Sequence, residues 1–181
     1  MSGTSGGAEA GAAGSMDAQQ IFQRLAKACE GALLSDAPGV GGWPRVNVVS
    51  SRVAEVARVL RDDPELNFDC LTNLTGVDLK SADQIEVCYH IFSYRYRHQI
   101  MLAVQASRGD PMVPTLTHLW PAANWLEREC FDLLGVRFDG HPDMRRILMP
   151  EDWVGHPLRK DFVEPDSYHG ISTRRESLLK L

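Results

Sequence analysis

The stretch QIEVCYHIFSYRYRHQIMLAVQA, residues 84 to 106, decides the fold because it has the pattern of two consecutive β-strands. Along each half, side chains alternate between two faces with the period of two that a strand requires. The residues that share one face are Ile85, Val87, Tyr89 and Ile91 in the first half and His98, Ile100, Leu102 and Val104 in the second. The short connection SYRY, residues 93 to 96, predicts an antiparallel hairpin.

Two helices and a short strand are predicted before this hairpin. Asp17 is a good N-cap for the first helix, a strand follows around residues 46 to 49, and Ser50 or Ser51 caps the second helix. Pro64 closes that helix. The apolar residues at helical spacing are Ile21, Leu25, Ala28 and Cys29 in the first helix and Val53, Val56, Ala57 and Leu60 in the second. Residues 68 to 79 mix strand-forming residues with a turn.

A third helix is predicted from residue 121 to 135, since Pro121 suits its first turn and Gly135 suits its end. Its broad apolar side consists of Ala122, Trp125, Leu126, Cys130, Leu133 and Leu134. After it, no hydrophobic period is sustained, and His-Pro, Met-Pro and Gly-His-Pro breaks interrupt a charged segment.

This order of elements predicts an α+β fold in which helices pack on one face of a small, mostly antiparallel sheet. A chain of 181 residues suits one domain. We expect a disordered leader at residues 1–15, because its small residues cannot offset the entropy of ordering. Residues 16–135 are the predicted core domain. Residues 136–181 are predicted to form an extended segment, called here the C-terminal arm.

Composition excludes several classes of function. The formal net charge of −5 gives no reason to expect nucleic acid as a ligand. Apolar runs are far shorter than the roughly 20 residues that span a bilayer, so we expect membrane contact only through a partner. The cysteines Cys29, Cys70, Cys88 and Cys130 include no C-x-x-C pair, which argues against an iron–sulfur or zinc site in this chain alone. The N-terminus lacks an export signal, so a cytoplasmic location is expected.

Catalysis by this chain is the weaker interpretation of its charged residues. Glu129 and Asp132 are three residues apart and share a side of the third helix, as an acid–base pair requires, whereas Glu127 lies elsewhere. Arg128 and Arg137 are close enough in sequence to form ion pairs with them. The histidines show no H-x-x-x-H or H-E-x-x-H spacing, so structural hydrogen bonds are favoured over metal ligation.

The first part of the C-terminal arm is too polar for a core and too apolar for water. Residues 139 to 161 contain five acids, four bases, two histidines and three prolines, together with Leu148, Met149, Trp153 and Leu158. Such mixtures become stable when backbone and charges are paired against a second surface. Prolines also lower the entropy lost on docking. We therefore interpret the arm as an interface whose charges meet partners on another polypeptide.

The stretch ANWLERECFDLLGVRFDGHPDMRRILMPEDWVGHPLRKDF, residues 123 to 162, resembles the family of the C subunit, the 30 kDa subunit, of the proton-pumping NADH–quinone oxidoreductase, respiratory complex I. The hairpin and its lead-in, from about residue 68 to 104, also resemble this family. The motif residues that match, interpreted as an interface and structural motif, are Glu127, Arg128, Glu129, Asp132, Gly135, His141, Pro142, Arg145, Arg146, Trp153, His156, Arg159, Lys160 and Asp161.

The resemblance implies a subunit without cofactors or catalytic residues in the peripheral arm of this translocase, on the cytoplasmic side of the bacterial inner membrane. FMN, iron–sulfur clusters, NADH and quinone would bind to other subunits. The implied partners are the D subunit, of the 49 kDa type, and the B subunit, with which it would scaffold the quinone-reducing module.

The resemblance also suggests a specific hypothesis for the motif. Glu129, Asp132, Arg145 and Arg146 would form a charge network that fixes the path of the arm, and Trp125 and Leu133 would anchor the helix. Two other functions remain open at this point. One is the equivalent subunit of a membrane-bound nickel–iron hydrogenase, and the other is a free-standing acid–base enzyme using Glu129, Asp132 and His141.

Overall fold

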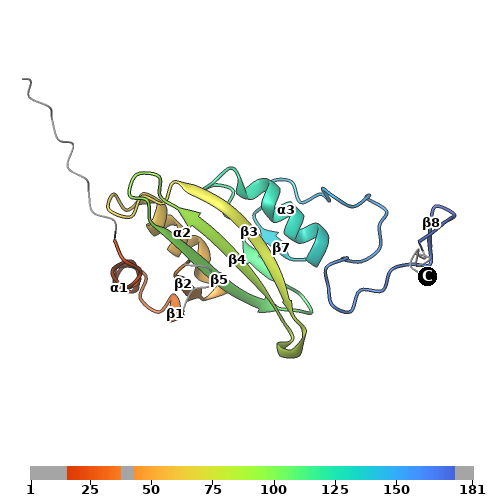
Figure 1. Cartoon of the computed structure of the whole chain (residues 1–181), viewed down its shortest axis with the longest axis horizontal. Helices are drawn as coiled ribbons and strands as arrows, with labels where there is room; N and C mark the ends of the chain where they lie inside the picture. The colour runs from red at the N-terminus through yellow and green to blue at the C-terminus, as the bar shows by residue number, and fades with distance from the viewer. Residues whose placement is uncertain (1–15, 38–42, 174–181) are drawn as a thin grey trace, which may run out of the picture.

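The predicted hairpin is part of a five-stranded sheet in the computed structural model, which describes residues 16–37 and 43–173 (Figure 1). The strands are β1 (Leu33–Ala37), β2 (Arg45–Val48), β3 (Cys70–Leu79), β4 (Gln84–Phe92) and β5 (Gln99–Ser107), arranged in the order β1-β2-β5-β4-β3. β4 pairs antiparallel with β5 and β3, β1 pairs antiparallel with β2, and β2 runs parallel to β5. The α+β fold with a mostly antiparallel sheet is confirmed. The expected leader lies outside the described residues, as do residues 174–181.

Helices α1 (Ala18–Ala28) and α2 (Val53–Asp62) contribute their apolar sides to the core over one face of this sheet. Asp17 forms the predicted N-cap, because its carboxylate accepts a hydrogen bond from the Gln20 N–H while the Gln20 side chain accepts one from the Asp17 N–H. The core unites Ile21, Leu25, Val53, Val56 and Leu60 of the helices with Ile85, Val87, Leu102 and Val104 of the hairpin.

Several predicted details are wrong. Residues 70 to 79 form one continuous strand without a turn, and a bulge between Leu71 and Asn73 is its irregularity. Strand β1 was not predicted. Neither Ser50 nor Ser51 caps α2: a 3-10 turn, η1 (Ser50–Arg52), precedes it, and the Ser50 hydroxyl donates instead to the Met112 carbonyl at 3.4 Å. His98 precedes β5, and its buried ring bonds the Leu66 carbonyl at 2.6 Å.

Helix α3 (Ala123–Leu134) lies on β3 and ends, as predicted, at Gly135, whose φ of 77° is the left-handed conformation that glycine adopts without strain. Gly76 of β3 makes the close packing possible. A Cβ atom there would lie 2.3 Å from Leu134 Cδ1 and 3.0 Å from Cys130 Sγ. The side chain of Trp125, predicted to anchor this helix, is 62% exposed in this chain, so its anchoring role stays a prediction.

The C-terminal arm begins in contact with the core domain and then leaves it. Strand β7 (Arg137–Asp139) pairs in parallel with β6 (Met112–Pro114), so the first residues of the arm belong to a small second sheet. Beyond β7 the chain runs along α3, returns to the ends of β3 and β5 at residues 159–161, and then extends toward β8 (Ser167–Tyr168) and β9 (Ile171–Ser172) (Figure 1). Within residues 16–37 and 43–173, no helix is both long and apolar enough to span a membrane.

Candidate functional site

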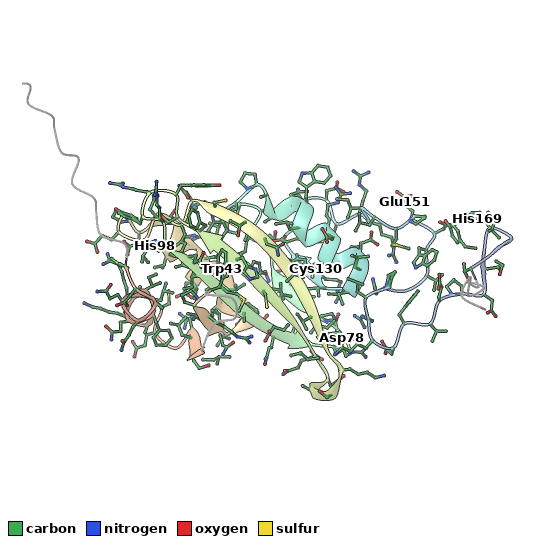
Figure 2. The ribbon with its side chains drawn as sticks, in the orientation of Figure 1. Trp43, Asp78, His98, Cys130, Glu151 and His169 are labelled. Carbon is green, nitrogen blue, oxygen red and sulfur yellow. The ribbon has the colours of Figure 1, made fainter. Side chains whose placement is uncertain are left out.

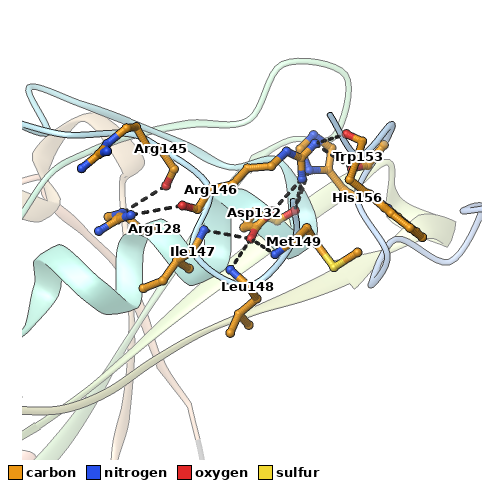
Figure 3. Close-up of polar contacts among 10 residues, drawn as sticks. Arg128, Asp132, Arg145, Arg146, Ile147, Leu148, Met149, Trp153 and His156 are labelled. Atoms are coloured by element: carbon orange, nitrogen blue, oxygen red, sulfur yellow. Dashed lines mark hydrogen bonds and ion pairs between the residues drawn. The ribbon is translucent and has the colours of Figure 1, made fainter. Parts of the chain in front are cut away.

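The carboxylate of Asp132 holds the start of the extended part of the arm (Figure 3). Its side chain is fully buried on α3. Oδ2 accepts hydrogen bonds from the backbone N–H groups of Ile147, Leu148 and Met149 at 3.0, 2.7 and 2.8 Å, and Oδ1 accepts one from Arg146 Nη1 at 2.6 Å. These groups are called here the Asp132 cluster. Three consecutive N–H donors on one oxygen impose a tight turn on residues 147–149.

The protonation state of Asp132 follows from these contacts. Burial by itself would raise the pKa of this carboxyl, because a charge loses its hydration. The backbone donors of Met149 and Leu148, the Arg146 guanidinium and the Ile147 donor outweigh burial and lower the pKa below its usual value. Asp132 is therefore an anion at neutral pH, and its charge is compensated inside this chain.

The arm also caps the C-terminal end of α3. The last carbonyl groups of a helix have no partner within the helix. Here the Asp132 carbonyl accepts from His156 Nδ1 at 2.9 Å, the Leu133 carbonyl from the Leu158 N–H at 2.9 Å, and the Leu134 carbonyl from Arg159 Nε at 2.7 Å.

Two features of this cap depend on the backbone. The bond from Leu158 joins two backbone groups, so it does not depend on the side chain at that position. Gly135 leaves room for the approach of the arm, since a Cβ atom there would lie 2.6 Å from His156 Nε2 and 2.9 Å from Arg159 Nη2. Gly135 therefore ends the helix in the left-handed conformation and also leaves the space into which the arm packs.

The expected charge network is partly wrong. Asp132 and Arg146 are paired, but Glu129 is exposed and forms no ion pair with any described residue, while Arg145 pairs with Asp143 at the surface. Arg128 neutralises neither Glu129 nor Asp132: it donates to the carbonyl groups of Arg145 and Arg146 at 3.0 and 3.1 Å. Arg137 pairs with Asp110 instead.

The remaining motif residues of the arm are arranged around these anchors. Arg146 Nη2 donates to the carbonyl groups of Trp153 and Gly155, both at 3.0 Å, and the Trp153 ring stacks on Phe162 with centroids 6.5 Å apart. Pro142 is exposed. The Lys160 N–H and the Asp161 carboxylate contact Asp78 and Arg108 respectively, two residues outside the motif. The prediction that the arm's charges meet partners on another polypeptide is thus wrong for Arg146 and Asp161, whose partners lie in this chain.

Glu127 forms a separate buried group at the other side of α3. Its Oε1 accepts from the Leu116 N–H at 2.7 Å and its Oε2 from the Thr115 hydroxyl at 2.6 Å. Burial raises the pKa of Glu127 to about 7, although both hydrogen bonds act in the opposite direction. His141 Nε2 lies 4.0 Å from Oε2 and 3.2 Å from the Asn124 carbonyl, while His141 Nδ1 accepts from the Asp143 N–H at 3.0 Å. This arrangement keeps the ring proton of neutral His141 on Nε2.

The geometry disfavours a free-standing acid–base enzyme built from Glu129, Asp132 and His141. Glu129 faces solvent, the carboxylate of Asp132 is saturated with donors, and His141 contacts Asn124 and Asp143. Within the described part of the chain, no group of three or more His, Cys, Asp or Glu side chains is placed to hold a metal ion. What the arrangement does is fix the conformation of a surface segment.

Sequence reasoning missed Asp78, Arg108 and Thr115 as contributors to this site. Asp78 contacts Lys160 across 82 positions of sequence, and Arg108 contacts Asp161 across 53. No local periodicity connects residues so far apart. The one signal available was an acid, Asp78, that follows the strand-forming residues of the segment from 68 to 79.

Comparisons of sequence agree with the motif. The profile of the family described as "Respiratory-chain NADH dehydrogenase, 30 Kd subunit" matches residues 46–168. A protein named as the C subunit of NADH-quinone oxidoreductase, from Roseiflexus castenholzii (strain DSM 13941 / HLO8), is 50% identical over 147 residues. That alignment covers 81% of this chain and 84% of the relative.

Comparisons of structure agree with the fold. A chain described as the trypsin-resistant fragment (1-134) of Nqo5 superposes with a TM-score of 0.59 and 25% identity, covering 71% of this chain and 99% of that chain. A chain of the membrane-bound sulfane sulfur reductase, an archaeal respiratory membrane complex, superposes with a TM-score of 0.68 and 22% identity. It covers 80% of this chain and 85% of that chain, and at this identity the likeness concerns the fold alone.

Proposed function

The chain belongs to the family of the 30 kDa subunit of the respiratory-chain NADH dehydrogenase, and on this premise we propose that it is a docking subunit of an NADH–quinone oxidoreductase. In this proposal the core domain is a rigid support, and the C-terminal arm is the surface that contacts neighbouring subunits. The chain contributes shape and stability to the complex, while NADH oxidation and quinone reduction occur on other subunits.

The observation that supports this role most directly is the exposure of large apolar side chains on an arm that is otherwise held in place. Those on the arm are Leu148, Val154, Leu158, Val163 and Ile171. Val154 is 85% exposed and Leu158 is 57% exposed. Exposed large apolar side chains on a fixed segment favour a surface that a partner covers. A flexible tail, by contrast, would not need the buried carboxylates of Asp132 and Asp78 to hold it.

The finer parts of the proposal concern partners, cofactors and place. We propose the D subunit, of the 49 kDa type, and the B subunit as the neighbours that cover the arm. FMN, the iron–sulfur clusters, NADH and quinone are assigned to other subunits, and the whole assembly to the cytoplasmic side of the bacterial inner membrane. The 50% identical relative is named as an NADH–quinone oxidoreductase subunit, which favours this function over that of a nickel–iron hydrogenase subunit.

Purification of the tagged chain from membranes of its own organism tests the proposal. We expect the chain to comigrate with NADH–quinone reductase activity and with flavin- and iron–sulfur-containing subunits. Crosslinks should join the arm to the neighbours that correspond to the B and D subunits. Mass spectrometry of the same fractions distinguishes an NADH-oxidising complex from a hydrogenase. A chain that migrates alone, or together with nickel–iron subunits, contradicts the proposal.

A further inference from the structure

Another buried carboxylate, that of Asp78, lies near the end of β3, beside η2 (Lys80–Ala82), the 3-10 turn that joins β3 to β4 (Figure 2). Its side chain is only 1% exposed. Oδ1 accepts from Arg108 Nε at 2.8 Å, and Oδ2 accepts from Arg108 Nη2 at 3.0 Å and from the Lys160 N–H at 2.8 Å. An acid buried in a strand is costly unless charged donors compensate it, and here the donors come from two other segments.

Arg108, directly after β5, joins Asp78 to three consecutive residues of the arm. Its guanidinium forms an ion pair with Asp161 as well as with Asp78. Its carbonyl accepts from Arg159 Nη1 at 3.3 Å. Together with the Lys160 N–H, these contacts hold residues 159–161 against the C-terminal ends of β3 and β5. We call this arrangement the Asp78 clamp; it consists of Asp78 and Arg108 on the core domain and residues 159–161 on the arm.

The Asp132 cluster fixes one end of a loop, and the Asp78 clamp fixes the other end together with the bonds of Leu158 and Arg159 to the end of α3. The cluster holds residues 146–149, and the clamp holds residues 159–161. Between them lie Val154, the most exposed large apolar side chain of the described residues, and Leu158. A loop that is fixed at both ends loses less conformational entropy when a partner binds it than a loop fixed at one end.

We propose that Asp78 and Arg108 are positioning residues, which hold residues 159–161 so that the loop from residue 150 to 158 presents its apolar side chains to the neighbouring subunit in one conformation. The inference rests on the proposed docking function and names two residues outside the motif of α3 and the arm. It requires that Asp78 and Arg108 contribute more to the position of residues 159–161 than to the stability of the sheet. Two contacts join the clamp to the arm: the Lys160 N–H donates to Asp78, and Arg108, which pairs with Asp78 inside the core domain, also pairs with Asp161.

Hydrogen exchange on the purified full-length chain tests the clamp directly. The Asp78→Asn variant removes the buried negative charge of the clamp. The Asp161→Asn variant weakens only the ion pair between Arg108 and the arm. We expect amides of residues 158–162 to exchange about tenfold faster in both variants, with the amides of β4 and β5 unchanged. Asp161→Glu is the matched rescue variant: Asp161 is half exposed, so a longer carboxylate still reaches Arg108, and exchange should return toward wild type. Glu30→Lys, an exposed change near the end of α1, is the control with no expected effect.

The same variants in the membrane complex test the positioning role. Asp78→Asn and Asp161→Asn should reduce the amount of neighbouring subunits that copurify with the chain, whereas Asp161→Glu should restore it. Wild-type exchange of residues 158–162 in both Asn variants would overturn the inference. Loss of protection across β4 and β5 in Asp78→Asn, with normal arm protection in Asp161→Asn, would also overturn it, because Asp78 would then serve the sheet. If the wild-type chain itself copurifies with no respiratory subunit, the proposed function fails, and so does the positioning role that rests on it.

Discussion

At the scale of single residues, Asp132 shows how one carboxylate determines the path of a long segment. A buried anion is stable only when its oxygen atoms are fully bonded. Asp132 meets this requirement with three backbone donors and a guanidinium from the arm. The arm therefore contributes to the stability of α3, and α3 in turn fixes the conformation of the arm.

Asp132→Ala should release the arm without unfolding the core domain. The substitution leaves Arg146 and the N–H groups of residues 147–149 without their acceptor, but these groups can move into water because the arm lies at the surface. We expect a loss of about 1–3 kcal/mol in the local stability of residues 146–149, seen as faster hydrogen exchange there. Glu129→Ala, an exposed change one helical turn away, is the control. Equal exchange rates in Asp132→Ala and wild type would contradict the anchoring role.

Glu127 makes the free energy of unfolding decrease as the pH rises, because its pKa is raised in the folded chain. Asp132, whose pKa is lowered, acts in the opposite direction. The pKa of Glu127 is raised from 4.5 to about 7 by burial, so the folded chain binds a proton that the unfolded chain releases between these values. The resulting stability is fully present below pH 4.5 and is lost as the pH rises through 7. A shift of this size corresponds to about 3 kcal/mol.

Glu127→Gln should remove this pH dependence. The amide keeps an acceptor for the Leu116 N–H and bears no charge at any pH. In urea unfolding, we expect the variant to resemble wild type near pH 5 and to exceed it by up to about 3 kcal/mol at about pH 8. Glu129→Gln is the exposed control and should follow the wild-type curve. A Glu127→Gln curve parallel to that of wild type at all pH values would show that Glu127 does not titrate in this range.

At the scale of elements, the contact between α3 and β3 decides where both anchors of the arm lie. Asp132 is on the helix, Asp78 is on the strand, and Gly76 allows the two elements to approach closely. The nearest atoms to a Cβ at position 76 belong to Leu134 and Cys130, both buried and without space to move freely. A change in this spacing would therefore displace the two anchors relative to each other.

Gly76→Ala should destabilise the chain by about 1–3 kcal/mol, the usual cost of inserting a methyl group into a packed contact. Combining it with Leu134→Ala removes the nearest clash. The double variant should therefore be more stable than the sum of the two single effects predicts. Urea unfolding of the wild type, the two single variants and the double variant measures this coupling. Gly109→Ala is the matched control, because a Cβ there meets nothing within 4 Å. If the changes in unfolding free energy of the two single variants simply add in the double variant, then α3 accommodates the extra methyl group at position 76 without a clash with Leu134.

At the scale of the whole molecule, the core domain and the arm differ in what they bury. The core domain encloses a continuous apolar cluster from α1 to β7. The extended part of the arm is held by hydrogen bonds and ion pairs and leaves several large apolar side chains exposed, among them Val154 and Leu158. This division of roles suits a subunit whose own stability does not depend on the surface it offers to partners.

Val154→Asp with Leu158→Asp should separate folding from assembly. Neither side chain is needed for the core, so thermal unfolding of the purified chain should match wild type. Placing two charges in a covered interface should weaken docking by at least about 2 kcal/mol and reduce the assembled complex in membranes. Leu34→Asp, which changes an exposed side chain on β1, is the control for a general effect of added charge. Normal assembly of the double variant would show that partners do not cover this loop.

The parts of the fold that could be predicted depend on neighbours in sequence. Asp17 caps a helix through Gln20, three residues later, and Gly135 ends α3 by its own backbone conformation. Alternation over nine residues identified both strands of the hairpin. Where tertiary contacts compete with local preference, prediction failed: Gly76 resembles a turn residue but permits helix packing, and Ser50 bonds Met112 in place of capping α2.

The candidate site could be predicted only in part, for the same reason. The motif identified Asp132, Arg146, His156 and Arg159, and the structure brings all four together at the end of α3. It did not reveal that Glu129 and Trp125 face solvent, because a helical period does not say which neighbours will cover a helix. The roles of the motif residues in docking remain a prediction.

The sequence by itself determined the hairpin, the start of α1, the end of α3, the α+β class and the family, since these follow from periodicity, caps and a long specific motif; α3 begins at Ala123 and not at the predicted Pro121. Only the tertiary structure decided that Arg146 and Asp161 of the arm find their partners within the chain, and that Asp78, Arg108 and Thr115 belong to the site. The physical reason is distance along the chain. A hydrogen bond between residues that are 53 or 82 positions apart leaves no local pattern, and it forms only after the sheet and α3 have placed its donors and acceptors together.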